Sequence, residues 1–445
     1  MVGQVVPTPP APRGSLLGGH VQAFRRDPLG FLERCRPYGP VVALRIGHKP
    51  VYLLTQPEGI HDALVLNHQD FVKDWRTRGL RVVMGDGLLV SEGDLWKRQR
   101  RMMQPAFHRE RILQYGRSMV QHAQRTARGW RDGLEVDAAQ EMANLTLGIV
   151  CDTLFGSGPE AAEGEVAELL PFMSRQVAWR TTALVTLPAW LPTPANARFR
   201  RDAVRLDTMI HRLIAERRGA GKPGMDLLSL LLQMRDEAGE GMTDAQLRDE
   251  VMTLFLAGHE TTANALSWLW VCLAQHPEVE EKLVAELRAV LRGDPPSPGD
   301  LPRLTYTDKV VRETLRLYPP AWLLGREVAR TTTVAGHSFP EGATVWLSPW
   351  LTHRDPALFE EPLAFRPERW TDDALRKLPP FAYWPFGGGP RTCIGQPFAM
   401  MELVLVLAAL LPAWRIVPRD AKVAPWPVVT LRPKGGVPAV VRRRA

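Results

Sequence analysis

"FGGGPRTCIG" spans Phe386–Gly395 and places four glycines and a proline around Cys393, one of four cysteines in a chain of 445 residues. A phosphate-binding loop is excluded because neither G-x-x-x-x-G-K-[ST] nor G-x-G-x-x-G occurs in this stretch. A cysteine nucleophile would need a histidine partner, and none is close to Cys393 in sequence, although a distant one could fold nearby. A third interpretation is a thiolate that ligates the iron of a flat cofactor, since glycines allow a macrocycle to approach the backbone.

The composition sets broad limits on the class of protein. Hydrophobic residues make up 45% and charged residues 23%, which is ordinary for a soluble globular protein. No C-x-x-C spacing occurs, so a reducing compartment is expected and a zinc-thiolate site is not. The N-terminus has no signal-peptide pattern, and the apolar run Leu403–Trp414 is shorter than the about 20 residues that span a bilayer. We therefore expect a cytoplasmic protein without a transmembrane anchor.

The net charge of +8 fits nucleic acid, an anionic membrane surface or an acidic protein partner. A recognisable nucleic-acid-binding motif is absent from the sequence, so no nucleic acid is expected as a partner. The densest basic segment is Trp96–Arg111, which a solvated helix face would also explain.

One long helix is predicted from Thr243, where "TDAQ" forms a capping box with Gln246, to just before Pro277. A helix of about 30 residues is roughly 45–50 Å long, and this one is apolar on nearly every side. Its centre is "AGHETT" (Ala257–Thr262), where a charged residue costs several kcal/mol unless it is compensated. "HETTA" is not the zinc motif H-E-x-x-H, because position 263 is Ala.

The rest of the chain is mostly helical in pattern, with short strands. Val41–Thr55 is predicted to form two strands that turn at Gly47–His48, and strand-like pieces lie between residues 331 and 349. A short helix carries Glu313 and Arg316 at i and i+3, which is usually a weak surface ion pair. A last apolar helix runs from about Gly395 to Leu411, and its N-terminal amides would stabilise a thiolate at Cys393.

The quoted stretch resembles the haem loop of the cytochrome P-450 family, F-x-x-G-x-R-x-C-x-G. The positions that match this pattern are Phe386, Gly389, Arg391, Cys393 and Gly395. The resemblance implies that Cys393 is the axial ligand of haem b (iron protoporphyrin IX), and that Phe386 shields its sulfur. It also implies a mainly α fold with small β-sheets: residues 16–445 form a single domain after a proline-rich segment 1–15, and the long helix crosses above the haem.

The long helix extends the resemblance. By similarity to the family, Ala257 and Gly258 leave room for dioxygen, while Glu260 and Thr261 form the acid–alcohol pair that delivers protons. Thr262 is expected to pack or to bond the helix backbone.

Further matches concern the haem propionates and the core of the fold. The family places cations or an indole at the positions of Trp96, Arg100, Arg326 and Arg391, which would hold the propionates; solvated surface arginines are the plain alternative for Arg100 and Arg326. The E-x-x-R pair of Glu313 and Arg316 would join Arg369 of "FRPERW", where Trp370 stands in the usual place of Phe.

The implied activity is a monooxygenase that inserts one oxygen atom from O2 into a hydrophobic small-molecule substrate. Flavin, nicotinamide and iron–sulfur motifs are absent from the sequence, so electrons are expected from a ferredoxin or flavodoxin with its reductase. The basic cluster of Lys97, Arg98 and Arg101 would suit an acidic donor.

The substrate is expected to be a carotenoid, fatty acid or terpenoid. By family position the pocket is lined by the mainly apolar segments Arg76–Val90, Leu170–Leu191, Ala321–Gly325 and "PWPVV". Two alternatives stay open: a peroxide-driven or non-oxygenating haem-thiolate enzyme, against which Glu260 and Thr261 argue, and a haem-based sensor.

Overall fold

The structure is a computed structural model and describes residues 9–444 apart from 17, 157–163, 166–167, 170–171, 174–175, 177–190, 192, 220–223, 225 and 421. The chain divides into two compact units, and each is described by itself. The first unit comprises Met1–Arg78 and Arg312–Cys393, and the second comprises Gly79–Val311 and Ile394–Ala445. The expectation that 16–445 is a single domain stays a prediction.

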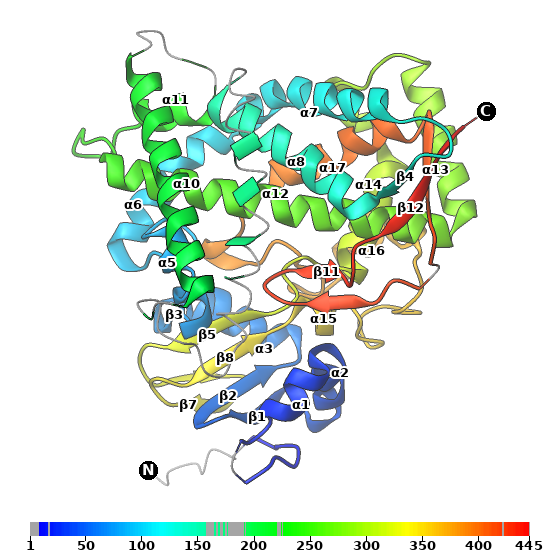
Figure 1. The fold of residues 1–445 in the computed structure, drawn as a ribbon. Helices are drawn as coiled ribbons and strands as arrows, with labels where there is room; N and C mark the ends of the chain where they lie inside the picture. The colour runs from blue at the N-terminus through cyan, green and yellow to red at the C-terminus, as the bar shows by residue number, and fades with distance from the viewer. Residues whose placement is uncertain are drawn as a thin grey trace, which may run out of the picture. The chain divides into compact units, whose positions relative to one another are not determined.

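The first unit is built on a five-stranded sheet. Its strand order is β1 (Val41–Ile46), β2 (Lys49–Leu54), β8 (Thr344–Leu347), β5 (Leu324–Val328) and β3 (Phe71–Lys73), labelled in Figure 1. The pair β1–β2 is the predicted hairpin, and Gly47 at its turn has φ +65°, a value that favours glycine. The strand β8 joins β2 in parallel, and the remaining pairs are antiparallel.

Short helices and a second hairpin complete the first unit. The hairpin is β6 (Thr332–Val334) with β7 (His337–Phe339). The short helical elements are α1 (Val21–Arg26), α2 (Pro28–Cys35), η1 (Arg36–Tyr38), α3 (Pro57–His61), η2 (Asp62–Leu66), η3 (His68–Asp70), α4 (Trp75–Arg78), α15 (Pro349–Thr352), η6 (Pro367–Arg369), α16 (Asp372–Lys377) and η7 (Gly389–Arg391). The helix α14 (Thr305–Leu317) begins in the second unit and ends in the first.

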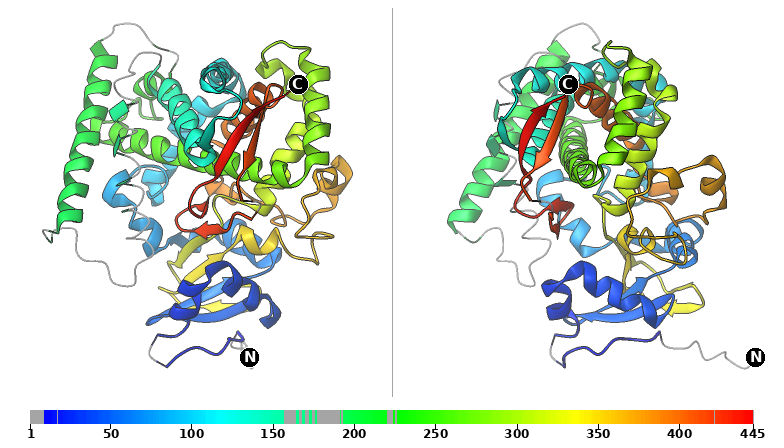
Figure 2. Two further views of the ribbon diagram at one scale, coloured as in Figure 1. Left: turned by 45° about the vertical axis from the view of Figure 1, so that its right-hand side comes forward. Right: turned by 90° about the vertical axis from the view of Figure 1, so that its right-hand side faces the viewer.

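The second unit is organised around α12 (Asp244–Gln275), the predicted long helix. Its capping box is present: the Gln246 N–H donates to Thr243 Oγ1 at 3.2 Å, and the Thr243 N–H donates to Gln246 Oε1 at 3.0 Å. Every residue from 262 to 273 is buried. The helices α8 (Ala138–Phe155) and α17 (Gln396–Leu410) pack on α12, and α7 (Arg109–Gly129) packs on both (Figures 1 and 2).

The remaining elements of the second unit are helices and two small sheets. The helical elements are α5 (Arg81–Met84), α6 (Gly93–Met103), η4 (Gln104–Phe107), α10 (Pro194–Gly219), α11 (Leu227–Gln233), α13 (Pro277–Leu291) and η5 (Pro298–Arg303). One sheet has the order β4 (Glu135–Asp137), β12 (Pro438–Arg443), β9 (Trp414–Pro418), and the other pairs β10 (Pro425–Pro427) with β11 (Leu431–Pro433). The expected class, mainly α with small β-sheets, is confirmed. Among the described residues, none of the helices is both long and apolar enough to cross a membrane.

The N-cap of α12 generates a stability prediction. In Thr243→Ala the Gln246 amide loses its acceptor, and we expect the free energy of unfolding to fall by about 1 kcal/mol in chemical denaturation. Thr243→Ser keeps the hydroxyl and should stay close to the unsubstituted protein. An equal loss in both variants would show that the methyl group, and not the cap, carries the effect.

Candidate functional site

The loop around Cys393 is closed on itself by backbone hydrogen bonds. The Cys393 N–H donates to the Phe386 carbonyl at 2.9 Å, and the Thr392 hydroxyl and amide both donate to the Gly389 carbonyl, at 2.8 and 3.0 Å. Cys393 is exposed, whereas Cys35, Cys151 and Cys272 are buried. Burial also raises the pKa of the Cys35 thiol to about 12, so Cys35 is not a thiolate near neutral pH. Cys393 is therefore the cysteine of the chain whose side chain is accessible.

The glycines of this loop are required by the chain's own packing. Gly389 has φ +66°, and a Cβ there would lie 2.0 Å from the Leu64 carbonyl oxygen. A Cβ at Gly388 would lie 2.1 Å from the ring of Phe381. These contacts leave no room for a side chain at either position. From the sequence, the glycines were expected to let a flat cofactor approach the backbone. That explanation stays a prediction for the loop.

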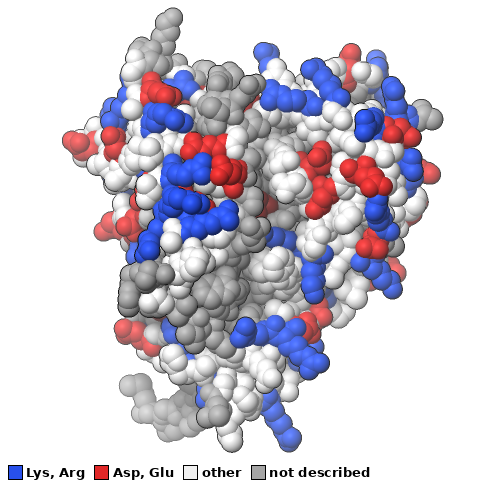
Figure 3. Space-filling model, in the orientation of Figure 1, with Lys and Arg blue, Asp and Glu red and all other residues white. Residues whose placement is uncertain are grey.

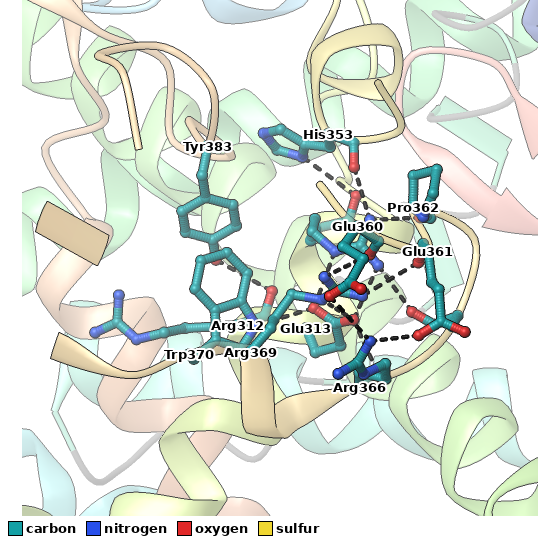
Figure 4. Close-up of polar contacts among 12 residues, drawn as sticks. Arg312, Glu313, His353, Glu360, Glu361, Pro362, Arg366, Arg369, Trp370 and Tyr383 are labelled. Carbon is teal, nitrogen blue, oxygen red and sulfur yellow. Dashed lines mark hydrogen bonds and ion pairs between the residues drawn. The ribbon is translucent and has the colours of Figure 1, made fainter. Parts of the chain in front are cut away.

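In the same unit, Glu313 and Arg316 form a fully buried ion pair. Figure 4 labels Glu313 together with its partners Arg369 and Trp370. The Arg316 guanidinium donates to Glu313 through Nε and Nη2, each at 2.9 Å. Arg369 Nε and Trp370 Nε1 donate to the same carboxylate at 3.0 and 2.9 Å. The predicted link from E-x-x-R to Arg369 is present, and Trp370 contributes a hydrogen bond that Phe could not make.

The rest of Arg316 is compensated by carbonyl groups. Its Nη1 donates to the carbonyls of His353 and Pro362 at 2.7 and 2.6 Å, and its Nη2 donates to Ala364 at 3.0 Å (Figure 4). A buried charge is tolerated only with this degree of pairing. We call Glu313, Arg316, Arg369 and Trp370 the polar centre.

His353 connects the polar centre to the thiol loop. The buried imidazole accepts from the Trp384 N–H at Nε2 (2.9 Å), so its proton lies on Nδ1, which donates to the Arg316 carbonyl at 3.2 Å. Burial and the Arg316 guanidinium hold the pKa of His353 well below its usual value, which keeps the ring neutral. Gly387 then donates to the Trp384 carbonyl at 3.0 Å, two residues before Gly389. The sequence offered no signal for His353, because its partners lie 31 and 37 positions away.

The predicted propionate ligands lie on three elements. In the first unit, Arg326 is buried on β5 and donates to the Gly325 carbonyl at 2.9 Å, and Arg391 is half-buried in η7. In the second unit, Trp96 and Arg100 are half-buried on α6, one turn apart. The burial of Arg326 excludes the solvated-surface alternative for this residue.

The middle of α12 has an accessible face just before its fully buried stretch 262–273. Ala257 is exposed, and Leu254, Gly258 and Thr261 are half-buried, at the i, i+3, i+4 and i+7 spacing of a single face. Thr261 and Thr262 donate to the carbonyls four residues back, at 2.7 and 3.1 Å. The backbone bond expected of Thr262 is thus present, and the Thr261 hydroxyl makes the same bond.

Glu260 is held by the β10–β11 hairpin. Arg432 Nη2 lies 2.7 Å from Glu260 Oε1, and the Thr430 hydroxyl donates to the same oxygen. Burial alone would raise the pKa of Glu260, but Arg432 and Thr430 outweigh it and leave the pKa below its usual value. Neither Arg432 nor Thr430 was identified from sequence, where they lie about 170 residues from Glu260.

The basic cluster on α6 is neutralised within the second unit. Lys97 pairs with Asp94 at 3.0 Å, Arg98 pairs with Asp236 at 2.6 Å, and Arg101 pairs with Glu237. On the face drawn in Figure 3, basic side chains likewise lie close to acidic ones. Arg98, half-buried, also donates to the Gly241 carbonyl at 3.1 Å, which makes it an internal contact rather than a docking residue.

Comparison with known proteins supplies the family. The family model described as Cytochrome P450 matches residues 8–436. The chain is 38% identical to cyclooctatin synthase and 37% identical to cyclooctat-9-en-7-ol 5-monooxygenase, both of Streptomyces melanosporofaciens, over 95% and 92% of this chain and 93% and 89% of those proteins. It is 35% identical to pentalenene oxygenase of Streptomyces avermitilis, over 95% of this chain and 94% of that one.

A solved structure shows the same fold. The retinoic acid-bound cyanobacterial CYP120A1 aligns with a TM-score of 0.87 at 26% identity, over 99% of this chain and 100% of that chain. The chain belongs to the cytochrome P450 family. It is a haem-iron monooxygenase, which uses O2, electrons from a redox partner and a hydrophobic substrate.

The link from the polar centre to the loop can be tested through His353. In His353→Leu, the Trp384 N–H and the Arg316 carbonyl lose their buried partner, which costs about 1–3 kcal/mol for each group. Thr352→Val is the matched control, because it removes only the 2.8 Å bond from the Trp384 indole. Hydrogen exchange should accelerate at the Gly387 and Cys393 amides in His353→Leu and much less in the control. Unchanged exchange in both variants would refute the link.

Proposed function

We propose that this P450 hydroxylates a terpenoid, with Cys393 as the axial ligand of haem b. The observation that carries the assignment of the ligand is the presentation of Cys393: it is exposed on a hydrogen-bonded loop, whereas the other three cysteines are buried. A thiolate-ligated haem iron supplies the oxygen-activating chemistry when bound. The residues of the loop fit this role, because the backbone bond from Cys393 to Phe386 fixes where the sulfur leaves the chain.

The remaining family positions have consistent surroundings. Arg326 and Arg391 of the first unit, and Trp96 and Arg100 of the second, would bind the propionates through charge-assisted or indole hydrogen bonds. On α12 the accessible face at Ala257 and Gly258 would admit O2. Thr261 Oγ1 would hand on a proton after exchanging its bond to the Ala257 carbonyl, and Glu260 would resupply that proton.

The substrate class rests on the relatives and on the apolar lining of the second unit. Relatives at 37% and 35% identity are named for the oxidation of cyclooctat-9-en-7-ol and pentalenene, which are terpenoids, and the structural neighbour holds retinoic acid, an isoprenoid. Within the predicted lining segment Arg76–Val90, a cluster of Leu80, Met84 and Val90 packs with Leu89 and with Leu256 of α12. A pocket bordered by this buried apolar cluster would suit a hydrocarbon substrate. Most of the segment 170–191 lies outside the described residues.

The loop of this lining segment is fixed to α12. The Asp86 N–H donates to Asp249 at 2.8 Å and the Leu88 N–H donates to Glu250 at 2.9 Å. A Cβ at Gly87 would lie 2.1 Å from the Thr253 hydroxyl. The loop is therefore held on α12 by two hydrogen bonds and by close packing at Gly87.

For the electron donor we favour a ferredoxin or flavodoxin with its reductase. The ion pairs of Lys97 and Arg101 on α6 are exposed, so an acidic donor could exchange for Asp94 and Glu237 there. The same cysteine usage that predicted a reducing compartment supports a cytoplasmic location.

The iron ligand is tested by the carbon monoxide complex of the reduced protein. The unsubstituted protein should show a strongly red-shifted Soret band if the Cys393 thiolate holds the iron, because a thiolate would donate electron density to it. Cys393→Ser should lose that band, and Cys272→Ser, which alters a buried cysteine, should keep it. A red-shifted band that survives in Cys393→Ser would contradict the assignment.

Substrate class is tested by the Soret shift on titration. We expect a bicyclic or tricyclic terpenoid alcohol to give a saturable shift and turnover at micromolar concentration. A long-chain fatty acid and a carotenoid serve as controls of the same apolar character. If the protein turns over either control and does not respond to the terpenoid alcohol, the proposed substrate class is wrong.

A further inference from the structure

The β10–β11 hairpin is bound to α12 along a single helix face at the level of Glu260. Asn264 Nδ2 donates to the Thr430 hydroxyl at 3.1 Å, and Trp268 Nε1 donates to the Leu431 carbonyl at 3.0 Å. Glu260, Asn264 and Trp268 are spaced four residues apart, so they face the same way. The Trp268 bond anchors the hairpin separately from the ion pair between Glu260 and Arg432, whereas the Asn264 bond shares the Thr430 hydroxyl, which donates to Glu260 and accepts from Arg432 Nε at 3.4 Å.

The charged and titratable groups that act on Glu260 come from both elements. Arg432 and the Thr430 hydroxyl come from the hairpin, and His259 comes from α12 itself. His259 Nδ1 bonds the Phe255 carbonyl at 3.0 Å, and burial lowers the pKa of His259, so this ring is neutral near pH 7. Arg432 is therefore the principal countercharge of Glu260.

We infer that Arg432, assisted by Thr430, is a positioning residue that keeps Glu260 ionised and paired, and so sets when this acid can carry a proton. The inference rests on the proposed role of Glu260 in proton delivery. An ionised Glu260 takes a proton from water at Oε1 and leaves Arg432. It then gives that proton to Thr261 Oγ1, whose own hydroxyl proton moves on, and the carboxylate returns to Arg432.

This arrangement connects the hairpin with the proton path. Glu260 and Arg432 side chains are each about one-fifth exposed, at 20% and 21%, so water can reach the pair. A displacement of β11 that lengthens the ion pair would raise the pKa of Glu260, because burial would then be less compensated. The hairpin carries the "PWPVV" segment, which is expected to line the pocket. A substrate that moves this segment would therefore change the pKa of Glu260.

The test compares Arg432→Met, Glu260→Gln and the double variant. Lys434→Met is the matched control, since it removes one cation at the exposed end of the same hairpin. Arg432→Lys is the conservative variant, which keeps the charge and should restore behaviour close to that of the unsubstituted protein.

The first measurement needs no turnover and follows the thermal unfolding midpoint against pH. The folded pKa of Glu260 is lowered, so the ion pair stabilises the protein above the unfolded pKa, and this stability is lost as the pH falls through the folded pKa. Arg432→Met should therefore lower the midpoint most near neutral pH, with a difference that narrows in acid. Lys434→Met should show no such pH-dependent difference.

The second measurement follows product formed per electron pair consumed, against pH. Loss of an opposite charge at this distance raises the pKa of a carboxyl by about 1–3 units, so the pH dependence in Arg432→Met should move up by that amount. In the Glu260→Gln background, adding Arg432→Met should change nothing further.

The other outcomes overturn the inference in distinguishable ways. If Arg432→Met adds its full effect on top of Glu260→Gln, the arginine is a structural support and the inference fails. If Glu260→Gln disrupts coupling but Arg432→Met leaves the pH dependence unchanged, the inference fails while the role of Glu260 stands. If Glu260→Gln is silent, the proposed role of Glu260 fails and the inference falls with it.

Discussion

The buried ion pair of Glu313 and Arg316 is the interaction on which the first unit depends. Two charges without solvent would be strongly unfavourable, and breaking such a pair typically costs about 3–5 kcal/mol. Here Arg369 and Trp370 donate hydrogen bonds to the Glu313 carboxylate, and three carbonyl groups accept from the Arg316 guanidinium. These bonds hold the pair in one position. From it a continuous series of hydrogen bonds runs through His353 and Trp384 to the glycine loop. The thiol of Cys393 is thus presented by a buried charge and not by local sequence alone.

In the second unit, α12 also carries polar side chains that need partners. The role we propose for α12 requires small residues, an acid and a hydroxyl near the middle of a helix whose following turns are fully buried. The structure compensates the acid from outside the helix, through the hairpin that carries Arg432 and Thr430. The hydroxyls of Thr261 and Thr262 are satisfied within it, by carbonyl groups one turn back. Function is therefore accommodated by pairing, and the helix remains intact over its whole length.

Local signals in the sequence predicted local structure well. The first hairpin and the capping box of α12 follow from spacing and residue type, because each depends on near neighbours. The bond from Arg369 to Glu313, 56 positions apart, was expected only from the family resemblance. Long-range partners carried no such signal. A side chain at Gly388 would clash with Phe381, and one at Gly389 would clash with the Leu64 carbonyl. The countercharge of Glu260 is likewise distant in sequence, at Arg432. The ion pairs of Arg98 and Arg101 on α6 were missed for the same reason: Asp236 and Glu237 belong to a loop more than 130 residues away.

Monooxygenation of a terpenoid can be tested by following heavy oxygen from O2 into the product. The purified protein would be supplied with a reducing partner and a cyclic terpenoid alcohol under heavy-isotope dioxygen in ordinary water, and the product analysed by mass spectrometry. We expect the product to gain one heavy oxygen atom and the second atom to be reduced to water. A product whose new oxygen comes from water, or a terpenoid converted without any gain of oxygen, would contradict it.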